Sequence, residues 1–398
     1  MQEKSLVKTT KKDINLQFKL LSAIGIFIIV SGHCYKGGLS LGYEWFPIYS
    51  FQLALFAFIS GYFYKSRYEE NAGSYIFKRV KRLVLPAYIW NIVYGVFIII
   101  MSKFGYTIGA PVNLYNLFVM PFVDGEAFLY NLGSWFVYPL FVVCVFNVLF
   151  RKLLKVAKIY SEYIILAVYL AIGIFAIKSS INQAGNIYGV KLLLYRTMFF
   201  LPCFEFGHFY KIKLEKIDNL GSVAYFSILF AVQLILIACF DELNYTPSKC
   251  SGFVNGCTIP YVTAITGIAF WLRVSKLLTP VVGNWKFVRM VADNTYSIMI
   301  HHLLGFMCVK WMFYILSVIT PAFSDFNVNL MKSSIWYYYI PDGKTQYALL
   351  YALAGIFVSI LIKKICDIVV KKAKNLLQEK KPTHDNEVEN KEKQVVMK

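Results

Sequence analysis

Apolar residues run through this chain in long blocks separated by short polar connections. A helix that spans a bilayer needs about 20 mostly apolar residues. Windows of this length lie near residues 20–37, 47–64, 83–101, 133–150, 161–178, 192–210, 220–240, 258–275, 293–315 and 345–365. The pattern predicts an all-α integral membrane protein, a bundle of about ten transmembrane helices. Segment 113–123 is apolar but too short to cross, so we expect it to lie on the surface or to re-enter from one side.

The composition supports this class. Of the 398 residues, 58% are hydrophobic and 16% are charged, whereas ordinary globular domains carry about 25% charged residues. This composition excludes a soluble enzyme. The net charge of +19 would point to a nucleic-acid partner in a soluble protein, but cytoplasmic loops of membrane proteins also collect basic residues.

The positions of the basic residues predict the orientation. With a cytoplasmic N-terminus, 32 of the 41 Lys and Arg residues fall in the connections on the cytoplasmic side, as the positive-inside rule requires. Both termini are therefore expected in the cytoplasm. No small-residue cleavage site follows the first apolar run, so we expect the first helix to be retained.

The same pattern divides the chain into three regions. Residues 1–19 are expected to form a cytoplasmic N-terminal segment, and residues 20–365 a transmembrane domain. Residues 366–398 are rich in Lys, Glu, Asn and Gln, which predicts a charged cytoplasmic tail that is largely disordered.

Ionisable residues inside membrane spans are costly and are functional candidates by default. From the predicted spans we select His33, Arg196, Glu205, His208, Asp293, His301 and His302 as candidates. We expect Asp293 to cap a helix in the sequence ADNTYS. Glu205 and His208 share one helix face, either as an interior pair or as interfacial polar residues.

Six segments resemble, in the same order, motifs of the acyltransferase family 3 membrane proteins, particularly the fucose 4-O-acetylase-like members. The segments are LLSAIGIFIIVSGHCYKGG, FQLALFAFISGYFYKS, KRVKRLVLPAYIW, GSWFVYPLFVV, RTMFFLPCFEFGHFYK and NTYSIMIHHLLG. The resemblance covers essentially residues 13–365. It implies an acyl-CoA-dependent membrane O-acyltransferase.

Two histidines correspond to family motifs. The resemblance implies that a first-helix His is essential together with a basic residue eleven positions earlier; His33 matches the His, but Ser22 occupies the basic position. Lys19 lies one turn nearer the cytoplasm and is the expected substitute. The late motif places His302 on the family's His and His301 on a normally apolar position. Adjacent helix residues point about 100° apart, so both are not expected to face one cavity.

The chemistry fits these residue types. His33 is the expected general base, because a neutral imidazole can accept the proton of an attacking hydroxyl group near pH 7. The phosphates of acetyl-CoA are expected to meet inward-facing cations, with Lys19, Lys78, Arg79 and Arg82 as candidates. Positive-inside anchoring accounts for part of this cluster.

Four residues are candidates for substrate binding. Ser60 and Trp135 lie in family-like motifs, although small hydroxyl residues such as Ser60 also permit close helix packing. Arg196 either holds a glycan hydroxyl or an acyl oxygen, or pairs with an outer acidic loop. Glu205 completes the set. A tunnel is expected to lead from the cytoplasm near Lys78–Arg82 to His33, because exposed amides in lipid are costly.

The cysteines give no sign of a metal site, since no CxxC pair and no His-Cys cluster occurs. We expect no metal cofactor. Cys250 and Cys257 share a predicted outer loop, where they form either a disulfide or two free thiols.

The implied partners are a glycan or lipid-linked saccharide acceptor, membrane lipid and other proteins of envelope polysaccharide assembly, with no nucleic acid. The expected location is the cytoplasmic (inner) membrane. A transporter or flippase for a glycan or lipid is the alternative, but the inverted repeats and broken helices typical of transporters are not visible. A non-catalytic scaffold leaves the membrane histidines unexplained.

Overall fold

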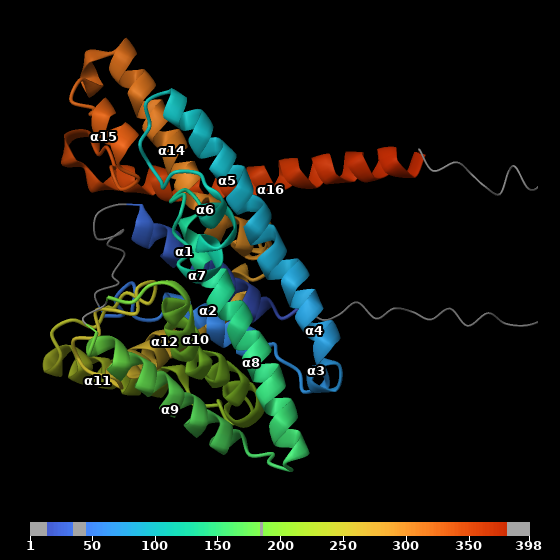
Figure 1. Cartoon of the computed structure of the whole chain (residues 1–398). Helices are drawn as coiled ribbons and strands as arrows, with labels where there is room; N and C mark the ends of the chain where they lie inside the picture. Colours follow the sequence, from blue (N-terminus) through green and yellow to red (C-terminus); the bar gives the residue numbers. More distant parts are fainter. Residues whose placement is uncertain (1–13, 35–44, 184–185, 380–398) are drawn as a thin grey trace, which may run out of the picture.

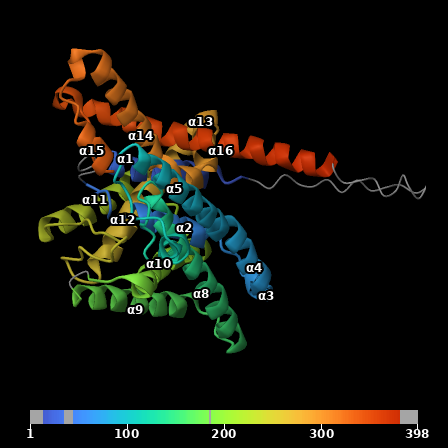
Figure 2. The same ribbon diagram turned by 45° about the horizontal axis from the view of Figure 1, so that its top comes forward.

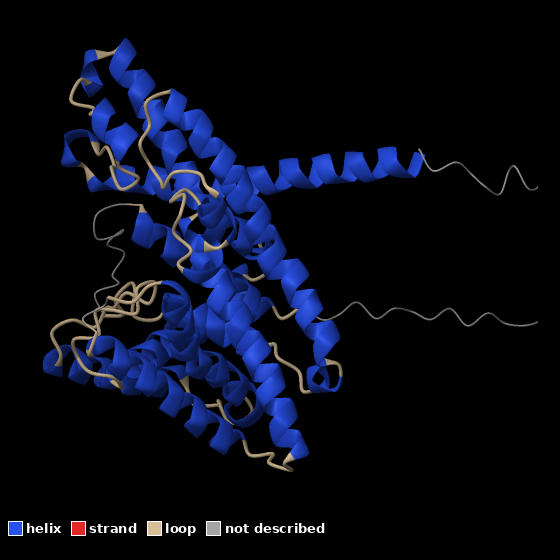
Figure 3. Cartoon of the chain, viewed as in Figure 1, coloured by secondary structure: helices blue, strands red, loops and turns tan. Residues whose placement is uncertain are grey.

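The computed structural model describes residues 14–34, 45–183 and 186–379, and these ranges are helical without any β-strand (Figure 3). The ten predicted spans each contain a long helix: α1 (Leu16–His33), α2 (Gln52–Tyr62), α5 (Leu85–Lys103), α8 (Val137–Val156), α9 (Glu162–Ile181), α10 (Gly189–Phe209), α11 (Ser222–Cys239), α12 (Ile259–Val282), α14 (Thr295–Ile319) and α16 (Ala348–Glu379). Shorter elements connect them: α3 (Arg67–Glu70), α4 (Ala72–Arg79), η1 (Val80–Val84), α6 (Leu114–Phe118), α7 (Met120–Val123), η2 (Leu132–Phe136), η3 (Tyr210–Leu214), α13 (Lys286–Asp293), η4 (Pro321–Phe323), α15 (Val328–Ser333), η5 (Pro341–Gly343) and η6 (Thr345–Tyr347).

Seven helical stretches in the described ranges are long and apolar enough to cross a membrane: Leu16–His33, Ala72–Lys103, Leu132–Val156, Glu162–Ile181, Ser222–Cys239, Ile259–Val282 and Thr295–Ile319. The other three predicted spans lie in α2, α10 and α16, and α2 has only 11 residues. An all-helical, multi-pass membrane fold is thus confirmed. The count of ten crossings and the cytoplasmic location of both termini stay predictions.

Two hydrophobic cores divide the bundle, and α1 contributes to both. Phe18, Leu21 and Ile28 of α1 pack into a core with α2, α8, α9, α10 and α12. Ile26 and Val30 pack into a second core with α5, α14 and α16. Figures 1 and 2 show the corresponding separation, with α9–α12 grouped on one side and α14–α16 on the other. Helix α1 therefore forms the partition between two helix groups.

Helices α2 and α10 cross at very close range through two glycines. A Cβ atom at Gly61 would meet the backbone carbonyl of Phe204, and a Cβ atom at Gly207 would meet the backbone carbonyl of Phe58. Small residues let transmembrane helices approach in this way. The ISGY motif thus packs through Gly61, while its neighbour Ser60 lines the cavity described below.

The expected helix cap at Asp293 is wrong. Asp293 ends α13, and the residue before α14 is Asn294, whose side chain makes no N-cap hydrogen bond to α14. The Asp293 carboxylate instead forms an ion pair with the ammonium group of Lys19. The sequence windows missed this arrangement because they did not separate the short helix α13 from the span that follows it.

Two connecting or terminal segments also take defined forms. Segment 113–123 contains the two short helices α6 and α7 and does not form a spanning helix. The expected disorder from residue 366 onward is wrong for residues 366–379, because α16 continues to Glu379 and extends away from the bundle (Figure 1). The ion pair between Lys363 and Asp367, four residues apart, supports this extension. Residues 380–398 lie outside the described part of the chain.

We expect Gly207→Val to destabilise the protein by about 3 kcal/mol, the upper end of the usual cost of overpacking, because the obstacle is backbone and cannot rotate away. The midpoint of thermal unfolding in detergent measures this loss. Gly73→Ala in α4 is the control, since a Cβ atom there meets nothing within 4 Å and alanine favours the helix. An unchanged midpoint for Gly207→Val would contradict the close crossing.

Candidate active-site cavity

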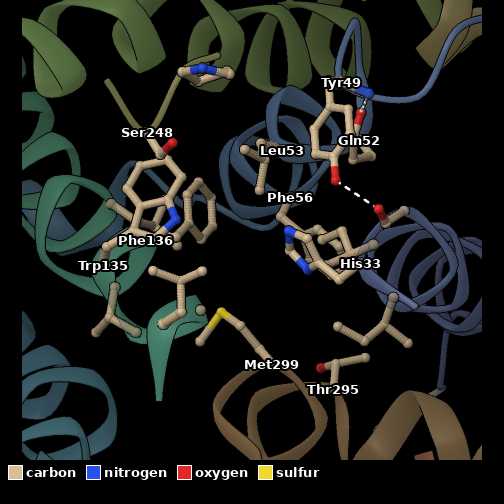
Figure 4. Close-up of a pocket in the computed structure, with 18 of the residues that line it drawn as sticks. His33, Tyr49, Gln52, Leu53, Phe56, Trp135, Phe136, Ser248, Thr295 and Met299 are labelled. Atoms are coloured by element: carbon tan, nitrogen blue, oxygen red, sulfur yellow. Dashed lines mark hydrogen bonds between the residues drawn. The ribbon is translucent and has the colours of Figure 1, made fainter. Parts of the chain in front are cut away.

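A cavity of about 930 Å³ lies between the two helix groups, at the upper end of the usual size of small-molecule sites. Its wall is built by α1, α2, the π-helical turn η1, η2, the start of α8, the first turns of α14 and four loop segments. Figure 4 shows His33 and Trp135 on opposite sides of it. Of the sequence-predicted site residues, the structure brings three to this wall: His33, Ser60 and Trp135.

The cavity follows α1 over much of its length. Ser22 and His33 both line it, and at about 1.5 Å per residue they are about 16 Å apart along the helix axis. Leu83 and Tyr296 line the cavity as well, and the Tyr296 hydroxyl donates a hydrogen bond to the Leu83 carbonyl at 2.6 Å. Leu83 lies in the π-helical turn η1, directly after Arg82. The cavity therefore reaches the start of the basic third span.

His33 contacts the second predicted catalytic residue. Nδ1 of His33 lies 3.0 Å from Nε2 of His302, and the two rings are nearly coplanar at 11°. His302 is buried behind His33, and its own Nδ1 lies 3.0 Å from the carbonyl oxygens of Ile298 and Met299 in the preceding turn of α14. The two histidines thus form a chain that starts at the α14 backbone and ends in the cavity wall.

These hydrogen bonds fix the tautomer of each neutral imidazole ring. A carbonyl oxygen only accepts, so His302 carries its proton on Nδ1, and its Nε2 is an acceptor. His33 must then donate from Nδ1, which leaves Nε2 of His33 with a lone pair. The nitrogen that remains for a cavity ligand is therefore a hydrogen-bond acceptor, the form that a general base needs.

Two tyrosines hold the end of α1. The Tyr49 hydroxyl donates to the carbonyl of Gly32 at 2.8 Å, and the Tyr338 hydroxyl donates to the carbonyl of His33. Both carbonyls belong to the last turn of α1, where a helix leaves carbonyl groups without partners. Burial raises the pKa of Tyr338 well above its ordinary value, so this phenol stays a donor. These contacts fix the backbone that carries His33.

No sequence pattern pointed to these tyrosines or to Gln52. Gln52 is buried in the cavity wall, and its Oε1 accepts the backbone N–H of Tyr49 at 2.6 Å. Because the donor is a backbone amide, the oxygen of the side chain must face it, which leaves the NH₂ group of Gln52 for the cavity. Tyr49 has a positive φ of 75°, a conformation that single residues rarely adopt and that such contacts maintain.

His301 does not face the cavity. Its Nδ1 lies 2.8 Å from the Tyr94 hydroxyl, and its ring packs against Trp90 of α5 at 4.1 Å. His301 is buried, but it does not line the cavity. The structure thus separates the two adjacent histidines onto different sides of α14.

The predicted donor-binding cations lie outside the cavity. Lys78 and Arg82 are exposed on α4 and η1, and Arg79 is half-buried with its guanidinium 5.1 Å from the Tyr75 ring. Lys19 is paired with Asp293 and does not line the cavity.

The position eleven residues before His33 is Ser22, which lines the cavity. Its hydroxyl donates to the Phe18 carbonyl at 2.7 Å.

Arg196 organises two loops at the edge of the cavity and does not line it. Its guanidinium donates to the carbonyl of Asp124 at 2.9 Å from one side and to the carbonyl of Ser248 at 2.8 Å from the other. It also lies 4.7 Å from the Trp135 ring. The loops then meet in an ion pair between Glu126 and Lys249, both of which line the cavity. The donors of Arg196 are thus engaged within the protein.

Glu205 lies in a separate buried network. Its Oε2 accepts from Arg151 at 2.6 Å, and Arg151 also bonds both oxygens of Glu162 at 2.8 and 3.0 Å. His208 lies 3.7 Å from Glu162. Arg151 is one of the 32 basic residues that the positive-inside count placed in cytoplasmic connections, but it is buried near the end of α8, where it joins three helices.

The loop cysteines are free thiols, with Cys250 buried and Cys257 half-buried. Burial raises the pKa of Cys250 to about 12, with a smaller opposing effect of Arg196. Within the described residues, no cluster of three or more His, Cys, Asp or Glu side chains is placed to hold a metal ion.

Comparison with known proteins finds one matching family. The model of a family described as an acyltransferase domain matches residues 15–364. No curated protein and no solved structure matches the chain.

We expect an impermeant maleimide to label Cys257 and not Cys250 in intact cells. The thiolate is the species that reacts with maleimide. The raised pKa of Cys250 keeps its thiol protonated, and its burial keeps the reagent away. Two variants that each keep one of these cysteines separate the signals. Labelling of neither thiol before reduction and of both after it, in a variant that keeps this pair, would show a disulfide and contradict the free thiols.

Proposed function

The chain belongs to acyltransferase family 3, and we propose that it is a membrane O-acetyltransferase that moves an acetyl group from cytoplasmic acetyl-CoA to a hydroxyl group of a cell-surface or lipid-linked glycan. The observation that carries the proposal is the oriented pair formed by His33, in the wall of a cavity that follows α1, and His302 behind it. We place the protein in the cytoplasmic membrane, with ten crossings and both termini in the cytoplasm.

The proposed reaction is a general-base transfer. Nε2 of His33 takes the proton of the acceptor hydroxyl while the hydroxyl oxygen attacks the thioester carbonyl. The carbon–sulfur bond breaks, and the imidazolium returns its proton to the departing thiolate. The products are an acetyl ester and free coenzyme A. His302 keeps Nδ1 of His33 protonated, so that Nε2 is always the nitrogen that faces the reaction.

The charges of the cavity support a divided site for the donor. Among the described residues of its wall, Glu126 and Lys249 are the ones with full charges, and they pair with each other. Burying phosphate groups there without a cation would be costly. We therefore assign only the uncharged pantetheine arm and the acetyl group to the cavity. The phosphates stay at the cytoplasmic surface with Lys78 and Arg82, close to the η1 end.

Purified protein with radiolabelled acetyl-CoA and a glycan extract tests the proposal. We expect label to appear on the glycan as an alkali-labile ester. A transporter or flippase, the alternative function for a protein with such a cavity, would leave the labelled acetyl group in acetyl-CoA.

His33→Ala is expected to lower the turnover number by at least about 100-fold, because a general base contributes 10² to 10⁴, while the affinity for acetyl-CoA stays at the wild-type value. Steady-state transfer and equilibrium binding measure the two quantities. His301→Ala is the matched control, since it removes the adjacent imidazole, which contacts Tyr94 instead. Retention of more than a tenth of the turnover by His33→Ala would rule out this base.

His302→Ala should lower the turnover number by about 10- to 100-fold, the usual loss when the partner that orients a histidine is removed. His302→Gln supplies an acceptor oxygen for Nδ1 of His33 and should restore part of the rate. The pH dependence of turnover in all three proteins completes the test. Equal rates and unchanged pH profiles for the Ala and Gln variants would speak against an orienting role.

A further inference from the structure

Among the described residues of the cavity wall, Trp336 is an aromatic residue whose position no hydrogen bond of its indole explains. The Trp336 side chain is 47% exposed, yet it lines the cavity, and its ring centroid is 5.9 Å from that of His33. The hydroxyl groups of Tyr49 and Tyr338, which flank the same histidine, are already bound to the last carbonyls of α1. Among the aromatic rings of the described residues next to His33, Trp336 is thus the one that remains open to a ligand.

The segment that carries Trp336 is held firmly from within. Lys310 is fully buried in α14, and its Nζ donates to the Ile335 carbonyl at 2.6 Å. The same nitrogen lies 5.3 Å from the Tyr338 ring. A buried polar group is costly unless it is hydrogen-bonded, so this arrangement ties the residues on both sides of Trp336 to α14. The indole is therefore presented by a fixed backbone.

Polar groups occupy another part of the same wall. Thr246, Ser248, Lys249 and Glu126 come from the two loops that Arg196 holds together, and Figure 4 shows Ser248 across the cavity from His33. Hydroxyl, ammonium and carboxylate groups bind sugar hydroxyls as donors and acceptors. Because Glu126 and Lys249 pair with each other, this wall carries no net charge.

We propose that Trp336 and the Glu126–Lys249 pair form the acceptor subsite of this cavity, and that its ligand is a neutral pyranose. The indole stacks on the C–H face of the sugar, since the face of an aromatic ring is electronegative, and the loop residues bind the hydroxyl groups at its edge. The hydroxyl to be acetylated then lies at Nε2 of His33. The inference rests on the proposed transferase function and specifies its acceptor.

Binding and transfer by the purified full chain test the subsite separately. The probes are methyl glycosides of neutral hexoses and 6-deoxyhexoses, and methyl glycosides of hexuronic acids at the same concentration. We expect the neutral glycosides to bind and the hexuronides to bind at least tenfold more weakly. Trp336→Ala should raise the dissociation constant and the KM of the neutral glycosides at least tenfold, with the affinity for acetyl-CoA unchanged, and Trp336→Phe should restore part of the loss.

Trp285→Ala is the matched control, because Trp285 is also exposed but does not line the cavity. Glu126→Gln leaves Lys249 without its carboxylate partner and should shift the preference toward hexuronides. Wild-type binding of neutral glycosides without acetyl transfer would overturn the transferase function and keep the subsite. Transfer with the same KM in Trp336→Ala, or a change limited to protein yield and thermal stability, would overturn the subsite and keep the transferase.

Discussion

The contact between His33 and His302 is the interaction on which the rest of the site depends. It joins the end of α1 to the second turn of α14 through two hydrogen bonds that point the same way. The His33 imidazole donates to the His302 imidazole, which donates to a backbone carbonyl of α14. Such a chain is useful only if both rings are immobile. The tyrosine contacts to the last carbonyls of α1 and the burial of His302 meet this condition. Much of the surrounding architecture can be understood as support for one nitrogen atom.

The position of α1 explains why a cavity exists beside that atom. Each of the two cores packs tightly against its own side of this helix, and the α2–α10 crossing shows how close the packing becomes where glycines allow it. The space between the cores is left to larger side chains such as Phe56 and Met299, which line the cavity without filling it. The partition helix therefore carries structural and chemical residues on different faces.

Hydropathy and the motifs predicted the helical class, the seven helical stretches that are long and apolar enough to cross a membrane, and the histidines that prove to be in contact. These features depend on local composition and on short patterns. The partners of the charged residues could not be predicted, because they are set by the three-dimensional arrangement. Arg151 looked like a loop cation and is buried with Glu205, and Lys19 looked like a ligand for the donor and pairs with Asp293. Trp336 and Tyr338 belong to no pattern, since only the return of their loop brings them to His33.

The order of residues along the chain has a consequence for biosynthesis. His33 lies in α1, which is synthesised before the segments that carry His302 and Tyr338. Until α14 and the loop before α16 have been inserted, the imidazole and the carbonyl group of His33 lack the partners that orient them. A nascent chain, or one shortened before residue 338, would have the partition helix without all the contacts that hold its last turn. The geometry around His33 is thus complete only after α14 and the loop before α16 are in place.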